Sequence, residues 1–235
     1  MTHCTICNTV LDGEFCKNCG QQNTQKKLDI KSFFSDLSSN VFDLDQSLFY
    51  NIYYILRFPK KVIENYWAGF RNYYYNPGKV LFYFLTLSGL SSYILRNSLL
   101  GIDINVPDVV STQFIFILII YPIFILTSYL TYRKNHRTII EHATASIYIV
   151  STIGIVLLVF QSIFTYYKIT HTRNSVWLPI LLILVTIWNS FIYTRNKKLI
   201  YKILNPLTEI LIFIIVIFII LLISHFTGIL NIGNS

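Results

Sequence analysis

Long apolar stretches alternate with short polar ones over residues 80–235. A helix that crosses a bilayer needs about 20 mostly apolar residues. Five stretches come near this length, and the segments between them carry lysine, arginine and asparagine. We therefore predict five transmembrane helices, which are Val80–Leu100, Thr112–Tyr132, Ala143–Tyr167, Val176–Tyr193 and Leu207–Leu230.

The predicted spans differ in the side chains that they offer to a neighbour. The last is rich in isoleucine on every face from Ile210 to Ile223, which is typical of a lipid-exposed helix at an edge. Small side chains in the first and third spans let helix backbones approach closely, so we expect these two at helix–helix contacts. These small residues are Ser88, Gly89, Ser92, Ala145, Ser151 and Gly154.

Two amphipathic stretches precede the first span. In the first, apolar side chains recur at helical spacing behind a cap at Asp29 or Ser32. In the second, an apolar stripe follows Asp45, and Pro59 ends it. Neither stretch is long enough to cross a bilayer, and the tyrosines around them favour the headgroup region, so we expect a collar of interfacial helices. The two stripes are Phe33, Phe34, Leu37, Val41 and Leu44, then Leu48, Phe49, Ile52, Ile55 and Leu56.

Two turn signals lie between this collar and the first span. Gly69 permits a turn after a helix over residues 60–67, and Pro77-Gly78 is expected to break the structure again. Arg71 and Tyr74 lie between these turns and suit an elbow at headgroup level. Binding of a lipid phosphate by Arg71 is the functional alternative.

Composition and charge agree with a membrane location. Of the 235 residues, 54% are hydrophobic and 13% are charged, whereas a soluble domain carries about a quarter charged residues. With residues 1–79 inside and five spans, sixteen of the 19 lysines and arginines fall inside, leaving Arg96, Lys168 and Arg173 outside. Because positive loops favour the cytoplasm, we predict a multi-pass membrane protein with a cytoplasmic N-terminus and an outside C-terminus.

All four cysteines lie near the N-terminus, as two Cys-x2-Cys pairs. Two such pairs supply four thiolates to one tetrahedral ion, and so small a head needs the metal in order to fold. We predict a structural Zn²⁺ site, ahead of iron, because four protein ligands leave no open position for catalysis. Two disulfides are the alternative, but disulfides seldom persist in the cytosol. The predicted ligands are Cys4, Cys7, Cys16 and Cys19.

The other residues of the head indicate which kind of partner it binds. His3 is a fifth candidate ligand, but beside four thiolates we expect it to be an exposed polar residue. Zinc ribbons often bind nucleic acid, yet residues 1–31 carry four lysines against three carboxylates, too weak a positive charge for a phosphate-binding surface. We therefore expect a protein partner for the head and membrane lipid around the helices, with no nucleic acid.

Ionisable residues at the edges of the spans are further candidates, since burying them is costly. Glu141 and His142 precede the third span, and neighbours on a helix point about 100° apart, so the two do not form one metal-binding face. We expect Glu141 to pair with Arg137 at i,i+4 and His142 to anchor at the interface. A sharper hypothesis pairs Glu141 with Arg71 across the cytoplasmic face. The other edge residues are Glu209 and His225.

The head and the segment before the first span resemble a known family. Phe15-Cys16-Lys17-Asn18-Cys19-Gly20-Gln21 resembles the ribbon signature of a bacterial membrane-protein family, domain of unknown function 3667. The Tyr-x2-Gly-x-Arg-x2-Tyr-x-Asn-Pro pattern from Tyr66 to Pro77 and the Glu141-His142 pair also look like this family, although Phe70 stands where the family often has lysine. The resemblance covers about the first eighty residues well. It implies a zinc ribbon joined to a polytopic helical bundle, without an established activity.

These observations, with the bacterial source that the resemblance implies, predict an all-α polytopic protein of the bacterial inner membrane. It has about five transmembrane helices and a small Cys4 zinc ribbon. Its parts are the ribbon over residues 1–25, the interfacial helices and elbow over 26–79, and the transmembrane bundle over 80–235. We expect a non-enzymatic adaptor or assembly factor, because no Gly-rich phosphate loop, Gly-x-Ser-x-Gly elbow or His-Glu-x-x-His occurs in the sequence. The alternative is a small transporter or lipid-handling protein with a purely structural ribbon. An intramembrane enzyme using Glu141 and His142 is the third hypothesis.

Overall fold

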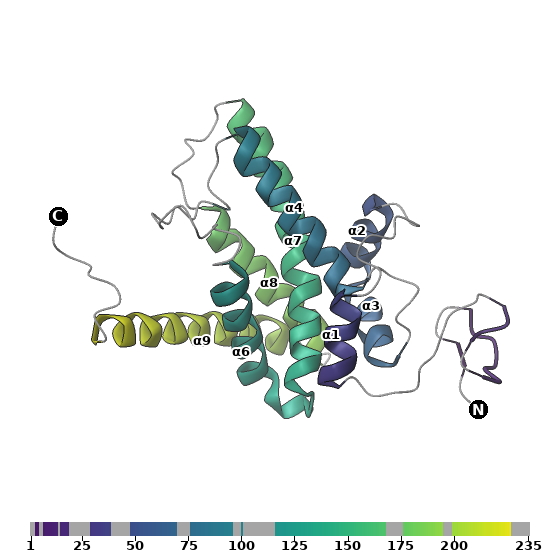
Figure 1. The fold of residues 1–235 in the computed structure, drawn as a ribbon. Coiled ribbons are helices and arrows are strands. Elements are labelled where there is room, and N and C mark those ends of the chain that lie inside the picture. The colour runs from purple at the N-terminus through teal and green to yellow at the C-terminus, as the bar shows by residue number, and fades with distance from the viewer. Residues whose placement is uncertain are drawn as a thin grey trace.

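Figure 1 shows the fold of the chain as a computed structural model. It describes residues 3–4, 7–13, 15–18, 29–38, 48–69, 76–95, 100, 116–167, 176–194 and 199–226. Within these ranges the chain after the head is helical and no strand occurs, although His3 and Val10 form an isolated antiparallel bridge in the head. The all-α prediction is therefore confirmed for the described part of the chain.

Three short helices lie where the collar was predicted, and their position at a membrane surface stays a prediction. Asp29 Oδ1 accepts the backbone N–H of Ser32 at 2.7 Å, so the expected cap of the first helix is confirmed. The second helix ends before Pro59, and the third begins there because proline suits the first turn of a helix. Gly69, with a φ of 95°, makes the expected turn after the third. The helices are α1 (Ile30–Ser38), α2 (Leu48–Arg57) and α3 (Pro59–Trp67).

A helix overlaps each of the five predicted spans. By length and composition, α7 and residues Ile200–Ile223 of α9 can cross a membrane, whereas α8 is apolar but has only 17 residues. The described residues thus contain two candidate spans, and the five-span arrangement remains a prediction. The helices are α4 (Pro77–Leu95), η1 (Phe116–Ile120) continuing as α6 (Tyr121–Tyr132), η2 (Arg133–Asn135), α7 (Ile139–Tyr166), α8 (Trp177–Tyr193) and α9 (Leu199–Phe226).

Prolines shape three of the described helices. α4 begins at Pro77, where a break was expected, because the Asn76 side chain caps it by accepting the Lys79 N–H at 2.7 Å. The π-helical turn η1 stands directly before the start of α6, where the ring of Pro122 and its missing N–H disturb the preceding turn. α9 begins at residue 199 and carries Pro206 inside it, although residue 207 was the expected start. Proline therefore shapes these helices without ending them.

α4 lies along α7, and the two make the most extensive helix pair of the fold (Figure 1). Within this contact Gly154 faces Phe84, so that a Cβ added to Gly154 would stand 2.5 Å from Phe84 Cε2. The hydroxyls of Ser91 and Ser162, also from these two helices, are 3.1 Å apart. The prediction that small residues of the first and third spans lie at a helix–helix contact is therefore confirmed.

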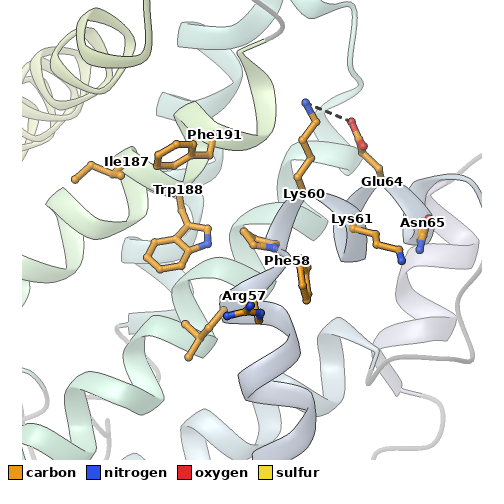
Figure 2. A pocket seen from close by; sticks show the side chains of 11 residues that line it. Arg57, Phe58, Lys60, Lys61, Glu64, Asn65, Ile187, Trp188 and Phe191 are labelled. Carbon is orange, nitrogen blue, oxygen red and sulfur yellow. Dashed lines mark ion pairs between the residues drawn. The ribbon is translucent and has the colours of Figure 1, made fainter. Parts of the chain in front are cut away.

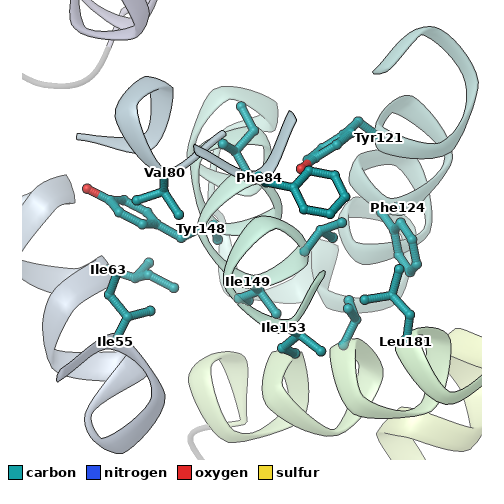
Figure 3. Packing of buried hydrophobic residues seen from close by; sticks show 14 of the residues in the cluster. Ile55, Ile63, Val80, Phe84, Tyr121, Phe124, Tyr148, Ile149, Ile153 and Leu181 are labelled. Carbon is teal, nitrogen blue, oxygen red and sulfur yellow. The ribbon is translucent and has the colours of Figure 1, made fainter. Parts of the chain in front are cut away.

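One hydrophobic core joins the collar to the long helices (Figure 3). Ile55 of α2 and Ile63 of α3 belong to the same buried cluster as Val80 of α4. The ring of Tyr66 meets that of Tyr148 in α7 edge-on, with their centroids 5.7 Å apart. α2 and α3 are therefore packed directly on the long helices, which fixes the collar in place.

α9 extends to one side, crosswise to α6 (Figure 1). Of the apolar 18-residue stretch of α9 only 17% is buried, whereas 67% of the corresponding stretch of α7 is buried. Phe213 packs on Phe124 of α6, whereas Ile214 and Phe218 on α9 are exposed. This exposure agrees with the expected lipid-facing helix at an edge, but the helices do not form a bundle of parallel rods.

Candidate functional site

The N-terminal head brings three of the four predicted metal ligands together. The Sγ atoms of Cys4, Cys7 and Cys16 all lie within 4.8 Å of one another, and Cys4 and Cys16 are buried. The Cys4 N–H donates to the Thr9 carbonyl and the Asn8 N–H donates to the Cys4 carbonyl, each at 2.8 Å. Asn8 has a φ of 60°, the left-handed conformation that asparagine tolerates well. The first Cys-x2-Cys pair thus forms the tight turn that a metal-binding knuckle requires.

The three sulfur atoms lie close enough together to share one metal ion. Zinc with Zn–S bonds of about 2.3 Å holds its sulfur ligands about 3.8 Å apart. The Cys7 and Cys16 sulfurs are 3.4 Å apart, and no disulfide joins the described cysteines. The Thr9 hydroxyl lies 3.2 Å from the Cys7 sulfur, where it can donate a hydrogen bond to a thiolate. Cys19 lies outside the described residues, so the fourth ligand and the identity of the metal remain predictions.

The polar residues around the sulfur cluster are exposed. His3 lies outside the cluster, with its Nδ1 atom 3.3 Å from the Asn8 carbonyl oxygen. Lys17 donates to the Asp12 carboxylate at 2.9 Å, and this hydrogen bond, together with the charge of the lysine, lowers the pKa of Asp12. On this part of the head a lysine is therefore paired with a carboxylate at the surface.

Glu141 joins the collar to the start of α7. Its Oε1 atom lies 2.9 Å from Arg137 Nη1, so the expected i,i+4 pair is confirmed. The Arg137 guanidinium in turn sits 4.5 Å from the centre of the Trp67 ring, and Trp67 Nε1 donates to the Glu141 carbonyl at 3.2 Å. Glu141 and Thr138 also form a reciprocal capping box at the start of α7. One side chain therefore caps α7 and holds an arginine over the tryptophan of α3.

His142 turns inward from the same turn of α7. Its side chain is fully buried, its Nδ1 atom lies 2.9 Å from Ser128 Oγ, and its ring stacks on Tyr193 with centroids 4.5 Å apart. Tyr193 stacks in turn on Tyr132, at 4.9 Å. The prediction that His142 anchors at the interface is wrong, because this face of α7 packs against α6 and α8. Glu141 and His142 occupy separate environments, as their angular separation on the helix predicts.

A carboxyl group is buried where α6, α8 and α9 meet. Glu209 is fully buried, and its Oε1 atom accepts a hydrogen bond from Asn189 Nδ2 at 2.6 Å. Tyr132 interacts electrostatically with the same carboxyl, but Glu209 Oε2 makes no hydrogen bond to any described residue. The sequence marks Glu209 only as an edge residue. The signal that locates its partner is Asn189, a polar side chain within an otherwise apolar span.

One contact of the site was not predicted from the sequence, and several predicted residues lie outside the described part of the chain. The sequence did not mark Trp67 as a site residue, yet it contacts Glu141, which is 74 positions away. No local pattern signals a contact over that separation. Outside the described residues lie Cys19, Arg71, Tyr74, Val41 and Leu44, so the pairing of Glu141 with Arg71 stays a prediction.

No family model, curated protein or solved structure matches the chain. The resemblance to the family called domain of unknown function 3667 therefore stays a prediction. The function of this chain is inferred from its own residues and their geometry.

Proposed function

We propose that the chain is a multi-span protein of the bacterial inner membrane whose cytoplasmic head docks a protein partner. Such a protein is an adaptor or assembly factor and not an enzyme. The observation that carries the proposal is the sulfur cluster of Cys4, Cys7 and Cys16, which stands in front of a chain of apolar helices.

The metal in the proposed head is Zn²⁺, held by the three clustered cysteines and Cys19. Four thiolates complete a tetrahedral shell and leave no position for a substrate, so the ion stabilises the head. A head of this size cannot fold on its apolar contacts alone. A small folded head without an open metal position is suited to recognition, which supports a protein partner.

The helix ends support the proposed topology. With the head inside, the end of α6, the start of α7, the end of α8 and the start of α9 all belong on the cytoplasmic side. Asn135 Nδ2 donates to the Tyr193 carbonyl, and Asn205 Nδ2 donates to Thr194 Oγ1, each at 2.7 Å. Trp67 of the collar reaches the start of α7 at the same end. We place the cytoplasmic face of the protein here.

In-cell crosslinking followed by pull-down tests the proposed docking. The native chain is compared with Cys7→Ser/Cys16→Ser, which removes two clustered sulfurs. Gly13→Ala is the matched control in the head, because an added Cβ there meets nothing within 4 Å. At equal membrane levels, we expect the native chain and Gly13→Ala to capture the same partner and the cysteine variant to lose it. Equal capture by all three proteins would contradict docking through the head and leave the head with a structural role.

Buried Glu209 favours a second function, that of a small cation or proton transporter. A carboxyl group inside apolar helices is costly and commonly marks an ion pathway. Beside it, a pocket of about 410 Å³ is lined by Tyr132, Tyr193 and Asn205, among others. Proteoliposomes with pH-sensitive and Na⁺- or K⁺-sensitive dyes test this function, with exposed Glu64→Gln as the control for Glu209→Gln. Fluxes that Glu209→Gln leaves unchanged would exclude it.

A further inference from the structure

A pocket of about 660 Å³ lies between the collar and α8 (Figure 2). One side of this pocket is basic and comes from the α2–α3 junction. The other side is apolar and comes from the last turns of α8. The basic residues are Arg57, Lys60 and Lys61, and the apolar ones are Ile187, Trp188 and Phe191. The pocket therefore offers two chemically different walls to a single occupant.

The charges of this pocket are predominantly positive. Glu64 is the acidic residue that lines it, and its Oε1 atom lies 3.9 Å from Lys60 Nζ, with both side chains about half exposed. An exposed pair at this distance is weak. Arg57 and Lys61 are exposed, and neither forms an ion pair with Glu64. An anion can therefore enter without displacing a strong ion pair.

Asn65 provides an independent indication that the pocket takes a ligand. Its side chain lines the pocket and is only 7% exposed. The Nδ2 atom is buried and has no hydrogen-bond partner among the described residues. Leaving this donor unpaired costs about 1–3 kcal/mol, which a rotation of the amide toward a phosphate oxygen in the pocket would recover.

We propose that this pocket binds an anionic phospholipid of the cytoplasmic leaflet. The phosphate lies against Arg57, Lys60 and Lys61, and an acyl chain lies along Ile187, Trp188 and Phe191. The proposed topology places the end of α8 at the cytoplasmic headgroup level, where anionic lipids meet basic pockets. A free phosphate would leave the apolar wall uncovered, which favours a lipid. The assignment rests on the proposed membrane location.

Trp188 makes the pocket measurable in the full-length protein. The chain is reconstituted into vesicles that contain either brominated phosphatidylglycerol or brominated phosphatidylcholine, whose bromine atoms quench tryptophan fluorescence on contact. The component lost in Trp188→Phe identifies the signal of the pocket among the three tryptophans. Each basic side chain near an anionic lipid contributes about fivefold in affinity. We expect the Trp188 signal to be quenched at least about fivefold more effectively by the anionic lipid at low salt.

Two variants and a salt titration separate this site from general surface charge. The first variant is Arg57→Gln/Lys60→Gln/Lys61→Gln, and it should bring the ratio of Trp188 quenching by the anionic lipid to quenching by phosphatidylcholine to about one. The second is the exposed set Lys31→Gln/Arg133→Gln/Lys134→Gln, and it should leave that ratio unchanged. In the native protein, 1 M NaCl should reduce the preference, because the Debye length falls to about 3 Å. Equal quenching by both lipids in the native protein overturns the lipid site and leaves the membrane location standing. No quenching by either lipid overturns both.

Discussion

The contact between Gly154 and Phe84 allows a sharp test of how α4 and α7 pack. The perturbation is Gly154→Ala, which adds one methyl group to α7. That carbon would stand 2.5 Å from Phe84 Cε2 and 3.0 Å from Cδ2, closer than carbon atoms approach. Phe84 is fully buried, so its ring can move away only by displacing other core side chains or filling a gap between them. The helices must separate or the ring must adopt a strained rotamer.

The expected loss of stability follows from two opposing effects. Overpacking a core position costs about 1–3 kcal/mol. Alanine is better than glycine inside a helix by about 1 kcal/mol. We therefore expect Gly154→Ala to lower the free energy of unfolding by up to about 2 kcal/mol. In a Phe84→Leu background the ring edge is gone, and the same change should be neutral or stabilise the protein by up to about 1 kcal/mol.

The assay is a double-mutant cycle on the purified chain in detergent micelles. Unfolding by sodium dodecyl sulfate is followed by helical circular dichroism for the native chain, both single variants and the double variant. Val159→Ala, at an exposed position of α7, is the control for shortening a side chain on the same helix. Independent sites add within about 0.5 kcal/mol. An equal effect of Gly154→Ala in both backgrounds would therefore refute the contact.

Three further outcomes are expected. The purified chain should contain one zinc ion by inductively coupled plasma mass spectrometry, and Cys16→Ser should lose it; full zinc content in that variant would exclude Cys16 as a ligand. Arg137→Ala should lower stability by about 1–2 kcal/mol and shift the Trp67 emission, because the ion pair and the cation–π contact are both lost; an unchanged spectrum would contradict the contact. Glu209→Gln should leave the free energy of unfolding nearly unchanged. Asn189→Leu should lower it by about 3 kcal/mol in the same assay, because it removes the hydrogen-bond donor of a buried carboxyl group. Equal losses in these two variants would contradict that reasoning.

The positions of the helices and the closeness of the cysteines in one Cys-x2-Cys pair could be predicted because both depend on local sequence. An apolar stretch of about 20 residues has few stable alternatives to a helix in a bilayer. Two cysteines separated by two residues are brought together by one turn, regardless of the rest of the chain. The Gly154 contact was also predictable, since only small residues permit close helix approach.

The interior of the candidate site could not be predicted, because it depends on which helices pack together. Adjacent Glu141 and His142 were both placed at the interface, and only the packing of α6 and α8 decides that His142 faces inward. Trp67 and Glu209 find partners on other helices, which no spacing within one helix reveals. The last span was predicted to begin at Leu207, whereas α9 is already helical at residue 199 and continues through Pro206.

The membrane crossing is tested most directly by locating both ends of the chain. Epitope tags are placed before Met1 and after Ser235, and protease is added to intact spheroplasts and to inverted membrane vesicles. Five spans with the head inside predict that spheroplasts lose only the C-terminal tag and that inverted vesicles lose only the N-terminal one. Protection of both tags in spheroplasts, with loss of both in inverted vesicles, would contradict five spans. It would place α9 along the membrane surface, in the crosswise direction that it takes in Figure 1.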